Sequence, residues 1–354
     1  MSSKIGVLGA GAWGTAIAKV IAEKNNDVLI WSFETDVRDD INNNGTNTRY
    51  LPDVKLPKTL KATSNIEEAA EGKQFLIYAS PSLFLLDTLK KTLSVNSIRE
   101  GETIIAVITK GFLPNENGPR LIIETMEDYL PGFFRESLVY ISGPSHAEEV
   151  SRGKVTGLIA ASESPKNSIR FRDLLNSPRL LVYSSLDVRG VQAAAAAKNV
   201  IAIAFGILDS MKSFGKIDMF GDGTESLLLA AGLNEIQQLG KALGATHPET
   251  FTSISGIGDL DVTCRSIYGR NRRFGREIIE KNILQNYKNI DDLLSRIGEI
   301  GYLPEGIAAA KYTQIIAEKY KLKLPVSLGI CRLLNRELDP HEFCKNLLAG
   351  WDNT

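Results

Sequence analysis

Short apolar runs alternate with amphipathic stretches through the first half of the chain. Residues 5–8 predict a strand, 12–24 the helix after it, and 28–31 a second strand before a polar helix at 35–44. Helices at 84–93 and 120–130 separate further strand candidates, at 75–78, 103–108, 138–141, 157–161 and 180–183. Continuous apolar strands alternating with helices are typical of a parallel sheet covered on both faces. We therefore expect an α/β, Rossmann-like, doubly wound dinucleotide-binding domain over residues 1–187.

After residue 187 the strand signal disappears and a helical period replaces it. Helices are expected at 193–208, 224–243, 274–281, 290–297 and 306–320, and glycine-rich segments at 255–258 and 298–301 predict loops between helices. The alanine-rich stretch 190–208 is interrupted by Lys198, which favours a packed interior helix over a membrane span. Residues 188–354 are thus expected to form an all-helical substrate-binding and catalytic domain.

The composition is that of an ordinary globular protein and restricts the partners. Lys and Arg number 41 against 42 Asp and Glu, and the net charge of −1 indicates no general affinity for nucleic acid or anionic membranes. The three cysteines show no CxxC spacing, which predicts free thiols in a reducing compartment. No histidines or carboxylates stand at the spacing of metal ligands, so we expect no metal site. An apolar run begins at residue 4 and residues 351–354 form no targeting tail, so we expect a cytoplasmic protein.

The spacing G-x-G-x-x-G occurs between the first predicted strand and the first helix, at Gly9, Gly11 and Gly14. Gly9 permits a tight turn, Gly11 lets the backbone approach a pyrophosphate, and Gly14 lets the helix pack on the strand. The free N–H groups at the helix start attract phosphates. Such turns also have purely structural uses, but their place in an alternating α/β half favours dinucleotide binding.

Glu34 follows the second predicted strand, about twenty residues after Gly14, where an acid can bind the adenosine ribose 2′-hydroxyl. An acid there would repel the extra phosphate of NADP, which favours NAD and leaves NADP possible. The alternative is an exposed carboxylate at a helix start, next to Thr35.

With the glycine motif and further motifs along the chain, the sequence resembles the NAD(P)-dependent glycerol-3-phosphate dehydrogenases in their bacterial-type form. The resemblance covers nearly the whole chain, and the ordered set of motifs is highly specific. The motifs are Gly9-Ala-Gly-Ala-Trp-Gly-Thr-Ala16, Asn47-Thr-Arg-Tyr-Leu-Pro52, Lys110-Gly-Phe112, Ser142-Gly-Pro-Ser145, Lys198-Asn-Val200, Gly256-Ile-Gly-Asp-Leu260, Thr263-Cys264 and Gly269-Arg-Asn-Arg-Arg-Phe-Gly275.

The resemblance implies an oxidoreductase that interconverts sn-glycerol 3-phosphate and dihydroxyacetone phosphate, supplies glycerol 3-phosphate for glycerophospholipid synthesis, and forms a homodimer. Lys198 would be the proton acceptor, with Lys110, Asn199, Asp259 and Thr263 in the same site. The implied substrate contacts also include Gly143, Ser145, Arg270 and Asn271. The implied cofactor contacts are Ala12, Trp13, Phe33, Lys110, Ala147, Arg270 and Glu305, beside the glycines and Glu34.

Three features depart from the family pattern. His146 replaces the usual phenylalanine after Ser-Gly-Pro-Ser, and Gly269 replaces the serine before Arg-Asn. Residues 211–234 lack the basic pair that the family generally places there, which bears on substrate access and on any subunit contact.

Oxidation of an alcohol by hydride loss requires a base whose pKa lies near neutrality. Lys198 lies in an apolar helix, where burial would lower the pKa of its amine, and a neighbouring cation such as Lys110 would lower it further. A lysine that reaches solvent from an exposed helix position is the alternative. Lys110 ends a predicted strand, where ligands bind in this fold, or is a surface lysine. Asp259 can instead be a helix cap or turn residue, and Thr263 by itself indicates only structure.

The densest basic cluster comprises Arg270, Arg272, Arg273 and Arg276. Arginine matches phosphate oxygens bidentately, and Arg270, beside Asn271, is the best phosphate ligand of the four. Arg273 and Arg276 are expected on a solvated helix face. Ser145 and Glu148 have the spacing of a capping box, so Ser145 is also a candidate helix start.

Two other functions fit part of this pattern. A dehydrogenase of another small hydroxy acid, such as a sugar acid or an opine, would use the same two-domain plan with a clamp for a carboxylate. A non-catalytic NADH-binding sensor would need the dinucleotide site but not the lysine base.

Overall fold

The computed structural model describes residues 2–214 and 220–349, which form two compact units. The first comprises residues 1–113 and 121–188, and the second 114–120 and 189–354. The domain boundary predicted at residue 187 placed segment 114–120 in the first domain, whereas the structure groups this segment with the second unit. Of the divergent stretch 211–234, residues 215–219 lie outside the described residues, as does the tail 351–354.

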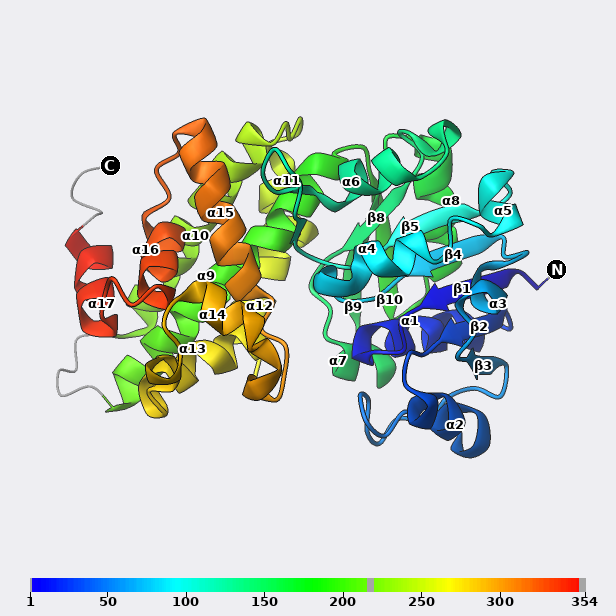
Figure 1. Ribbon diagram of the computed structural model, residues 1–354, viewed down its shortest axis with the longest axis horizontal. Helices are drawn as coiled ribbons and strands as arrows, with labels where there is room; N and C mark the ends of the chain where they lie inside the picture. The colour runs from blue at the N-terminus through cyan, green and yellow to red at the C-terminus, as the bar shows by residue number, and fades with distance from the viewer. Residues whose placement is uncertain (1, 215–219, 350–354) are drawn as a thin grey trace. The chain divides into compact units, whose positions relative to one another are not determined.

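The first unit is built on a sheet of eight strands in the order β10-β9-β8-β5-β4-β1-β2-β3 (Figure 1). Since β1 lies between β2 and β4, successive strands are added first on one side of β1 and then on the other. Ligands of such sheets bind at this switch point, beyond the carboxyl ends of the strands. The strands are β1 (Lys4–Leu8), β2 (Asp27–Trp31), β3 (Leu60–Thr63), β4 (Phe75–Tyr78), β5 (Ile104–Val107), β8 (Val139–Ser142), β9 (Thr156–Ala161) and β10 (Leu180–Ser185).

The doubly wound plan expected from the sequence is confirmed, with one strand pair reversed. All neighbours run parallel except β8 and β9, which are antiparallel, with Tyr140 opposite Ala161 and Ser142 opposite Ile159. The parallel direction expected from the sequence is therefore wrong for this pair, because an apolar run has the same pattern in either direction. The helices of this unit are α1 (Ala12–Glu23), α2 (Thr35–Asn44), α3 (Ile66–Ala70), α4 (Ser82–Lys90), α5 (Asn96–Arg99), α6 (Ile122–Tyr129), α7 (Ala147–Ser151) and α8 (Pro165–Leu175).

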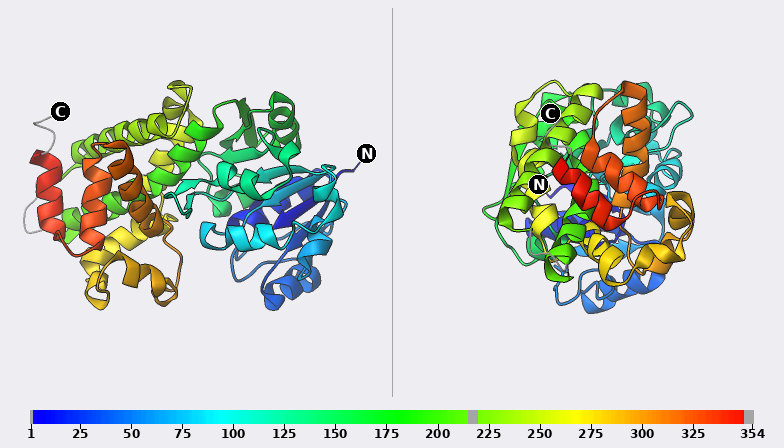
Figure 2. Two further views of the ribbon diagram at one scale, coloured as in Figure 1. Left: turned by 45° about the horizontal axis from the view of Figure 1, so that its top comes forward. Right: turned by 90° about the vertical axis from the view of Figure 1, so that its left-hand side faces the viewer.

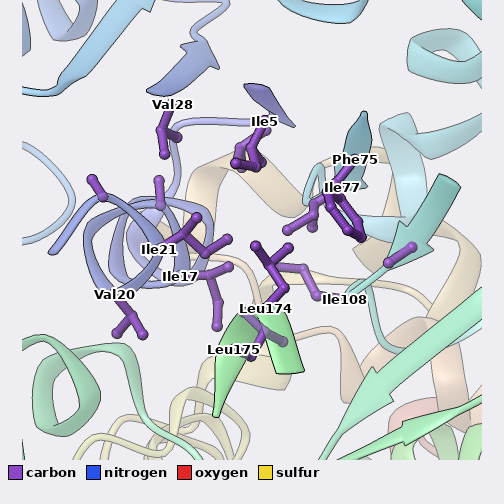
Figure 3. Close-up of a cluster of buried hydrophobic side chains, with 14 of the residues drawn as sticks. Ile5, Ile17, Val20, Ile21, Val28, Phe75, Ile77, Ile108, Leu174 and Leu175 are labelled. Atoms are coloured by element: carbon purple, nitrogen blue, oxygen red, sulfur yellow. The ribbon is translucent and has the colours of Figure 1, made fainter. Parts of the chain in front are cut away.

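Adjacent residues of β1 pack against helices on opposite faces of the sheet. Ile5 belongs to the buried cluster that Ile17 and Ile21 of α1 enter, and Figure 3 shows these side chains gathered with Leu174 and Leu175 of α8. On the other face a Cβ at Gly6 would lie 2.1 Å from the carbonyl oxygen of Ala69 in α3. Because successive strand residues point to opposite faces, helices cover both.

The second unit is helical in the residues that the structure describes (Figures 1 and 2). Its first helix is long and apolar enough over Val188–Ser213 to cross a membrane, yet its most apolar stretch is fully buried inside the protein. This confirms the packed interior helix. The helices are α9 (Val188–Phe214), α10 (Asp222–Ala242), α11 (Glu249–Thr252), α12 (Asp259–Arg265), α13 (Arg270–Glu280), α14 (Ile290–Ser295), α15 (Gly306–Tyr320), α16 (Pro325–Leu334) and α17 (Pro340–Ala349).

Several local expectations were wrong. The helix expected from residue 120 begins at Ile122, because Arg120 pairs in a short ribbon of β6 (Phe112–Leu113) and β7 (Arg120–Leu121). Segment 255–258 is no open loop but part of a π-helical turn, Ile254–Gly258, that continues into α12. Strand β3 and helices α16 and α17 were not expected at all.

Two glycines set how closely α9 and α13 cross. A Cβ at Gly206 would lie 2.0 Å from the carbonyl oxygen of Arg272, and one at Gly275 would lie 2.1 Å from that of Ile203. Neither position has room for a side chain, so the two backbones touch. This contact sets the position of α13 against the helix that carries Lys198.

Candidate functional site

The glycine turn after β1 has the geometry that its spacing predicts. Gly9 has a φ of +130°, which side chains rarely adopt, and its N–H donates to the carbonyl oxygen of Trp31. A Cβ at Gly14 would lie 2.0 Å from the oxygen of Gly9, so this glycine permits the close contact of helix and turn. At Gly11 a Cβ would meet nothing within 4 Å, which leaves open space above the N-terminus of α1.

The residues after β2 differ in exposure. Phe33 is 75% exposed, whereas Glu34 is half-buried at the N-cap position of α2. The Glu34 side chain makes no capping bond; instead its Oε1 accepts a hydrogen bond of 2.6 Å from the Tyr50 hydroxyl. Glu34 thus lies at a helix start, as the alternative of an exposed helix-start carboxylate supposed, but its carboxylate is half-buried and bonded to Tyr50.

Lys110, Gly143 and Ser145 converge at the carboxyl ends of β5 and β8. The carbonyl oxygen of Gly143 accepts from Lys110 Nζ at 3.4 Å and from Ser145 Oγ at 3.1 Å. Gly143 has a φ of +147° and contacts the backbone of Gly157, so glycine is required there. The helix start expected at Ser145 was wrong: α7 begins at Ala147 after His146, because Ser145 bonds Gly143 rather than a helix N–H.

The first helix residues lie beside the start of α7. Ala147 is buried in a small cluster with Ala16, and Ala12 and Trp13 pack against it while remaining partly exposed. Three of the positions that the resemblance assigned to cofactor contacts, Ala12, Trp13 and Ala147, therefore lie together beside the N-terminus of α1.

In the second unit Lys198 lies on α9 and is 4% exposed. Its Nζ donates to Asp259 Oδ1 in a buried ion pair and to Thr263 Oγ1 at 2.8 Å. Thr263 in turn donates to the carbonyl oxygen of Asp259 at 2.6 Å, as residues four apart on one helix can. The solvent-reaching alternative for Lys198 is therefore wrong.

Asp259 is the first residue of α12 and is 1% exposed, so its carboxylate partners the lysine and is not a surface cap. An opposite charge at contact distance favours the ammonium form of Lys198, while burial disfavours it. The buried Cys264 thiol nearby remains protonated, because burial raises its pKa. The sequence did not predict this ion pair between Asp259 and Lys198. It predicted that burial and a second cation would together lower the pKa of Lys198.

Two amides extend the site from Lys198 toward α13 and α15. Asn271 Nδ2 donates to Asn199 Oδ1 at 3.0 Å, and Asn271 Oδ1 accepts from the Gly306 N–H at 2.9 Å. A Cβ at Gly306 would lie 2.6 Å from the oxygen of Asn199, so α15 begins against α9. Glu305, the residue before, is half-buried at the N-cap position of α15.

The basic cluster separates into one unpaired arginine and three paired ones. Arg272 pairs with Asp209, and Arg273 and Arg276 each pair with the glutamate four residues on, in a largely exposed row. Arg270, the first residue of α13, is exposed and has no ion pair or side-chain hydrogen bond with any described residue. An unpaired guanidinium at a helix N-terminus is a favourable position for a phosphate.

The expected site residues thus fall into two sets, one in each unit. The first set comprises Gly9, Gly11, Ala12, Trp13, Gly14, Phe33, Glu34, Lys110, Gly143, Ser145 and Ala147, and the second Lys198, Asn199, Asp259, Thr263, Arg270, Asn271 and Glu305. Lys110 and Lys198 belong to different sets, so the influence of one cation on the other stays a prediction.

Comparison with known proteins identifies the family. The model of the N-terminus of NAD-dependent glycerol-3-phosphate dehydrogenase matches residues 4–168, and that of its C-terminus matches residues 187–345. The chain belongs to the NAD-dependent glycerol-3-phosphate dehydrogenases. The resemblance seen in the motifs is thereby confirmed.

Relatives match this family member along almost its whole length. A glycerol-3-phosphate dehydrogenase [NAD(P)+] of Treponema denticola is 55% identical over 99% of both chains, and one of Listeria monocytogenes is 34% identical over 98% of this chain and 96% of its own. The crystal structure of glycerol-3-phosphate dehydrogenase from Coxiella burnetii superposes with a TM-score of 0.84, at 31% identity, over 98% of this chain and 99% of that one.

Proposed function

We propose that this chain is an NAD(P)-dependent glycerol-3-phosphate dehydrogenase, which moves a hydride between the nicotinamide and carbon 2 of the substrate. The observation that carries the proposal is the buried Lys198–Asp259–Thr263 arrangement in a member of this family. A dinucleotide-binding sensor has no use for a buried lysine held by a carboxylate and a hydroxyl, whereas proton transfer to an alcohol oxygen requires such a group.

The glycine turn fits a dinucleotide. Open space above Gly11 leaves room for a pyrophosphate, and the N-terminus of α1 has no side-chain cap, so its N–H groups are available to anions. When bound, the nicotinamide supplies the hydride acceptor or donor. We assign to the cofactor Gly9, Gly11, Ala12, Trp13, Gly14, Phe33, Glu34, Lys110, Ala147, Arg270 and Glu305.

Lys198 would exchange a proton with the substrate oxygen. In the direction of reduction, the ammonium that Asp259 favours donates its proton as the ketone oxygen gains charge. In oxidation, the same nitrogen must first be neutral to accept the hydroxyl proton. Thr263 accepts one N–H of Lys198 and so orients the remaining N–H bonds. Asn199 and Asn271 would hold the substrate next to this nitrogen.

Arg270 would bind the substrate phosphate. It is unpaired among the described residues, and the α13 N-terminus adds the partial positive charge of its N–H groups. We assign Lys110, Gly143 and Ser145 to the same substrate, and we propose a homodimer in the cytoplasm that supplies glycerol 3-phosphate for phospholipid synthesis.

The test is the initial rate of NADH and NADPH oxidation, followed by absorbance, with dihydroxyacetone phosphate as substrate. The same chain is assayed with 2-keto acids, which the alternative dehydrogenases would reduce. The proposal expects turnover with dihydroxyacetone phosphate and a preference of at least about 10²-fold over the keto acids, since a phosphate clamp without its phosphate is left unpaired. NADH binding without any turnover would establish the sensor instead.

A further inference from the structure

The motif Asn47-Thr-Arg-Tyr-Leu-Pro52 has no role in the function proposed above, yet its side chains bond both the glycine turn and the acid after β2. Asn47 is 1% exposed. Its Nδ2 donates to the carbonyl oxygen of Ala10, inside the glycine turn, and to Thr15 Oγ1, both at 2.8 Å. Asn47 is therefore fastened to the turn that would hold the pyrophosphate.

Three residues further on, Tyr50 is fastened to the same asparagine. Its N–H donates to Asn47 Oδ1 at 3.2 Å, and its hydroxyl donates to Glu34 Oε1 at 2.6 Å. Leu51, 1% exposed, donates its N–H to the backbone carbonyl oxygen of Asn47 and packs on Ala16 of α1. The tyrosine is thus held through its backbone, and one continuous set of bonds joins the glycine turn to the acid after β2.

The Tyr50 hydroxyl is a permanent donor to this acid. Burial and the bond to Glu34 raise the pKa of Tyr50 to about 12, so the phenol keeps its proton at neutral pH. It engages one oxygen of the Glu34 carboxylate and restricts the rotation of the group. The other oxygen is not used by Tyr50 and can accept the directional hydrogen bond of a ribose hydroxyl.

The charges around the pair favour a hydroxyl over a phosphate. Arg49 lies over the Tyr50 ring, with its guanidinium carbon 5.3 Å from the ring centre, and its ion pair is with Asp36 at 3.3 Å. The hydrogen bond that the Glu34 carboxylate accepts comes from a neutral phenol and not from a cation. A 2′-phosphate placed against it would be repelled.

We propose that Tyr50 is a positioning residue that holds Glu34 as the acceptor for the adenosine ribose hydroxyl and thereby sets a preference for NADH over NADPH. The inference rests on the proposed function, because it takes the glycine turn and Glu34 as the dinucleotide site. Tyr50 acts through Glu34 and does not touch the reacting atoms.

The experiment measures the Kd of NADH and of NADPH by fluorescence titration of the full chain. Tyr50→Phe keeps the ring against Arg49 and removes only the hydroxyl. We expect the Kd of NADH to rise about three- to tenfold and that of NADPH to change less than about twofold, so that the preference falls. Glu34→Gln should lower the preference further, and adding Tyr50→Phe to it should change neither Kd by more than about twofold, because the two residues act as one unit.

A matched control exists in the second unit. There Tyr302 donates to Glu277 Oε2 at 2.6 Å, with Arg273 over its ring, so Tyr302→Phe removes the same kind of bond away from Glu34. It should leave the ratio of the two Kd values unchanged. Tyr50→Phe with an unchanged ratio, or with an effect that persists in full beside Glu34→Gln, would overturn the inference. If the wild-type chain binds neither nucleotide, the proposed function itself fails.

Discussion

Glu235 is a buried carboxyl that joins two helices of the second unit. It lies on α10, 3% exposed, and accepts hydrogen bonds from the Val326 N–H, the Ser327 N–H and the Ser327 hydroxyl at the start of α16. Burial raises its pKa from 4.5 to about 7, although the three donors act in the opposite direction. The group is therefore expected to make the stability of this unit depend on pH.

The size of the effect follows from the two pKa values. A tenfold change in proton affinity is worth about 1.4 kcal/mol, so a rise from 4.5 to about 7 corresponds to about 3 kcal/mol. Because the folded-state pKa lies above the unfolded one, the folded chain keeps a proton that the unfolded chain loses between these values. The stabilisation is complete below the unfolded pKa and is lost as the pH rises through about 7.

Glu235→Gln isolates this contribution, since the amide is uncharged at every pH. The amide must turn its N–H donors toward either the Val326 N–H or the two donors of Ser327, so we expect the variant to be less stable than wild type by about 1–3 kcal/mol at about pH 5. Urea unfolding of both proteins should show that gap shrinking by about 2–3 kcal/mol by about pH 8.5, because only wild type then buries a charge. A gap that stays constant or widens with pH would refute the reasoning: the three donors would then outweigh burial.

Three further outcomes follow from the packing and charge of single residues. Gly275→Ala should lower the free energy of unfolding by about 3 kcal/mol or more in urea titrations, because its Cβ would meet the α9 backbone. The control Gly223→Ala, at a position with open space, should be neutral or stabilising by up to about 1 kcal/mol. Equal effects of the two substitutions would contradict the close crossing of α9 and α13. Arg270→Ala should raise KM for dihydroxyacetone phosphate at least about tenfold in steady-state assays while Arg276→Ala changes it little, and the reverse order would move the phosphate elsewhere. Gly11→Asp should abolish NADH binding in fluorescence titrations yet keep or raise Tm, since φ is −67° there and Asp suits an N-cap; retained NADH affinity would refute the turn as the pyrophosphate site.

Much of the fold could be predicted because its signals are local. Helix α2 and strand β4 have the bounds that hydrophobic periodicity gave them, and the glycine turn at Gly9 is specified by three residues. The direction of β9 and the start of α7 depend on contacts that periodicity does not contain. Strand β3 (Leu60–Thr63) was missed because Lys61 and Thr63 interrupt it, so it lacks the continuous apolar run that marks β4, a strand of the same length.

The candidate site was predictable in its residues and less so in its contacts. Burial of Lys198 followed from its apolar helix neighbours, and it is confirmed. Its pairing with Asp259 links residues far apart in sequence, so no local pattern carries it. The bond from Tyr50 to Glu34 likewise joins residues from separate motifs, so no local pattern predicts it.

The central claim, that Lys198 exchanges the substrate proton, is tested most directly by kcat in a variant that lacks the ammonium. Removing it alone would leave the buried Asp259 unpaired, so Lys198→Met is measured together with Lys198→Met/Asp259→Asn, which removes both charges. We predict that both variants bind NADH, and that kcat for dihydroxyacetone phosphate reduction falls about 10²- to 10⁴-fold in each, the usual size of general acid–base assistance. In wild type, kcat/KM for glycerol 3-phosphate oxidation should rise with pH as the amine loses its proton, and this rise should vanish in the variants. Turnover within a few-fold of wild type in the doubly substituted chain, with the pH dependence intact, would contradict the account.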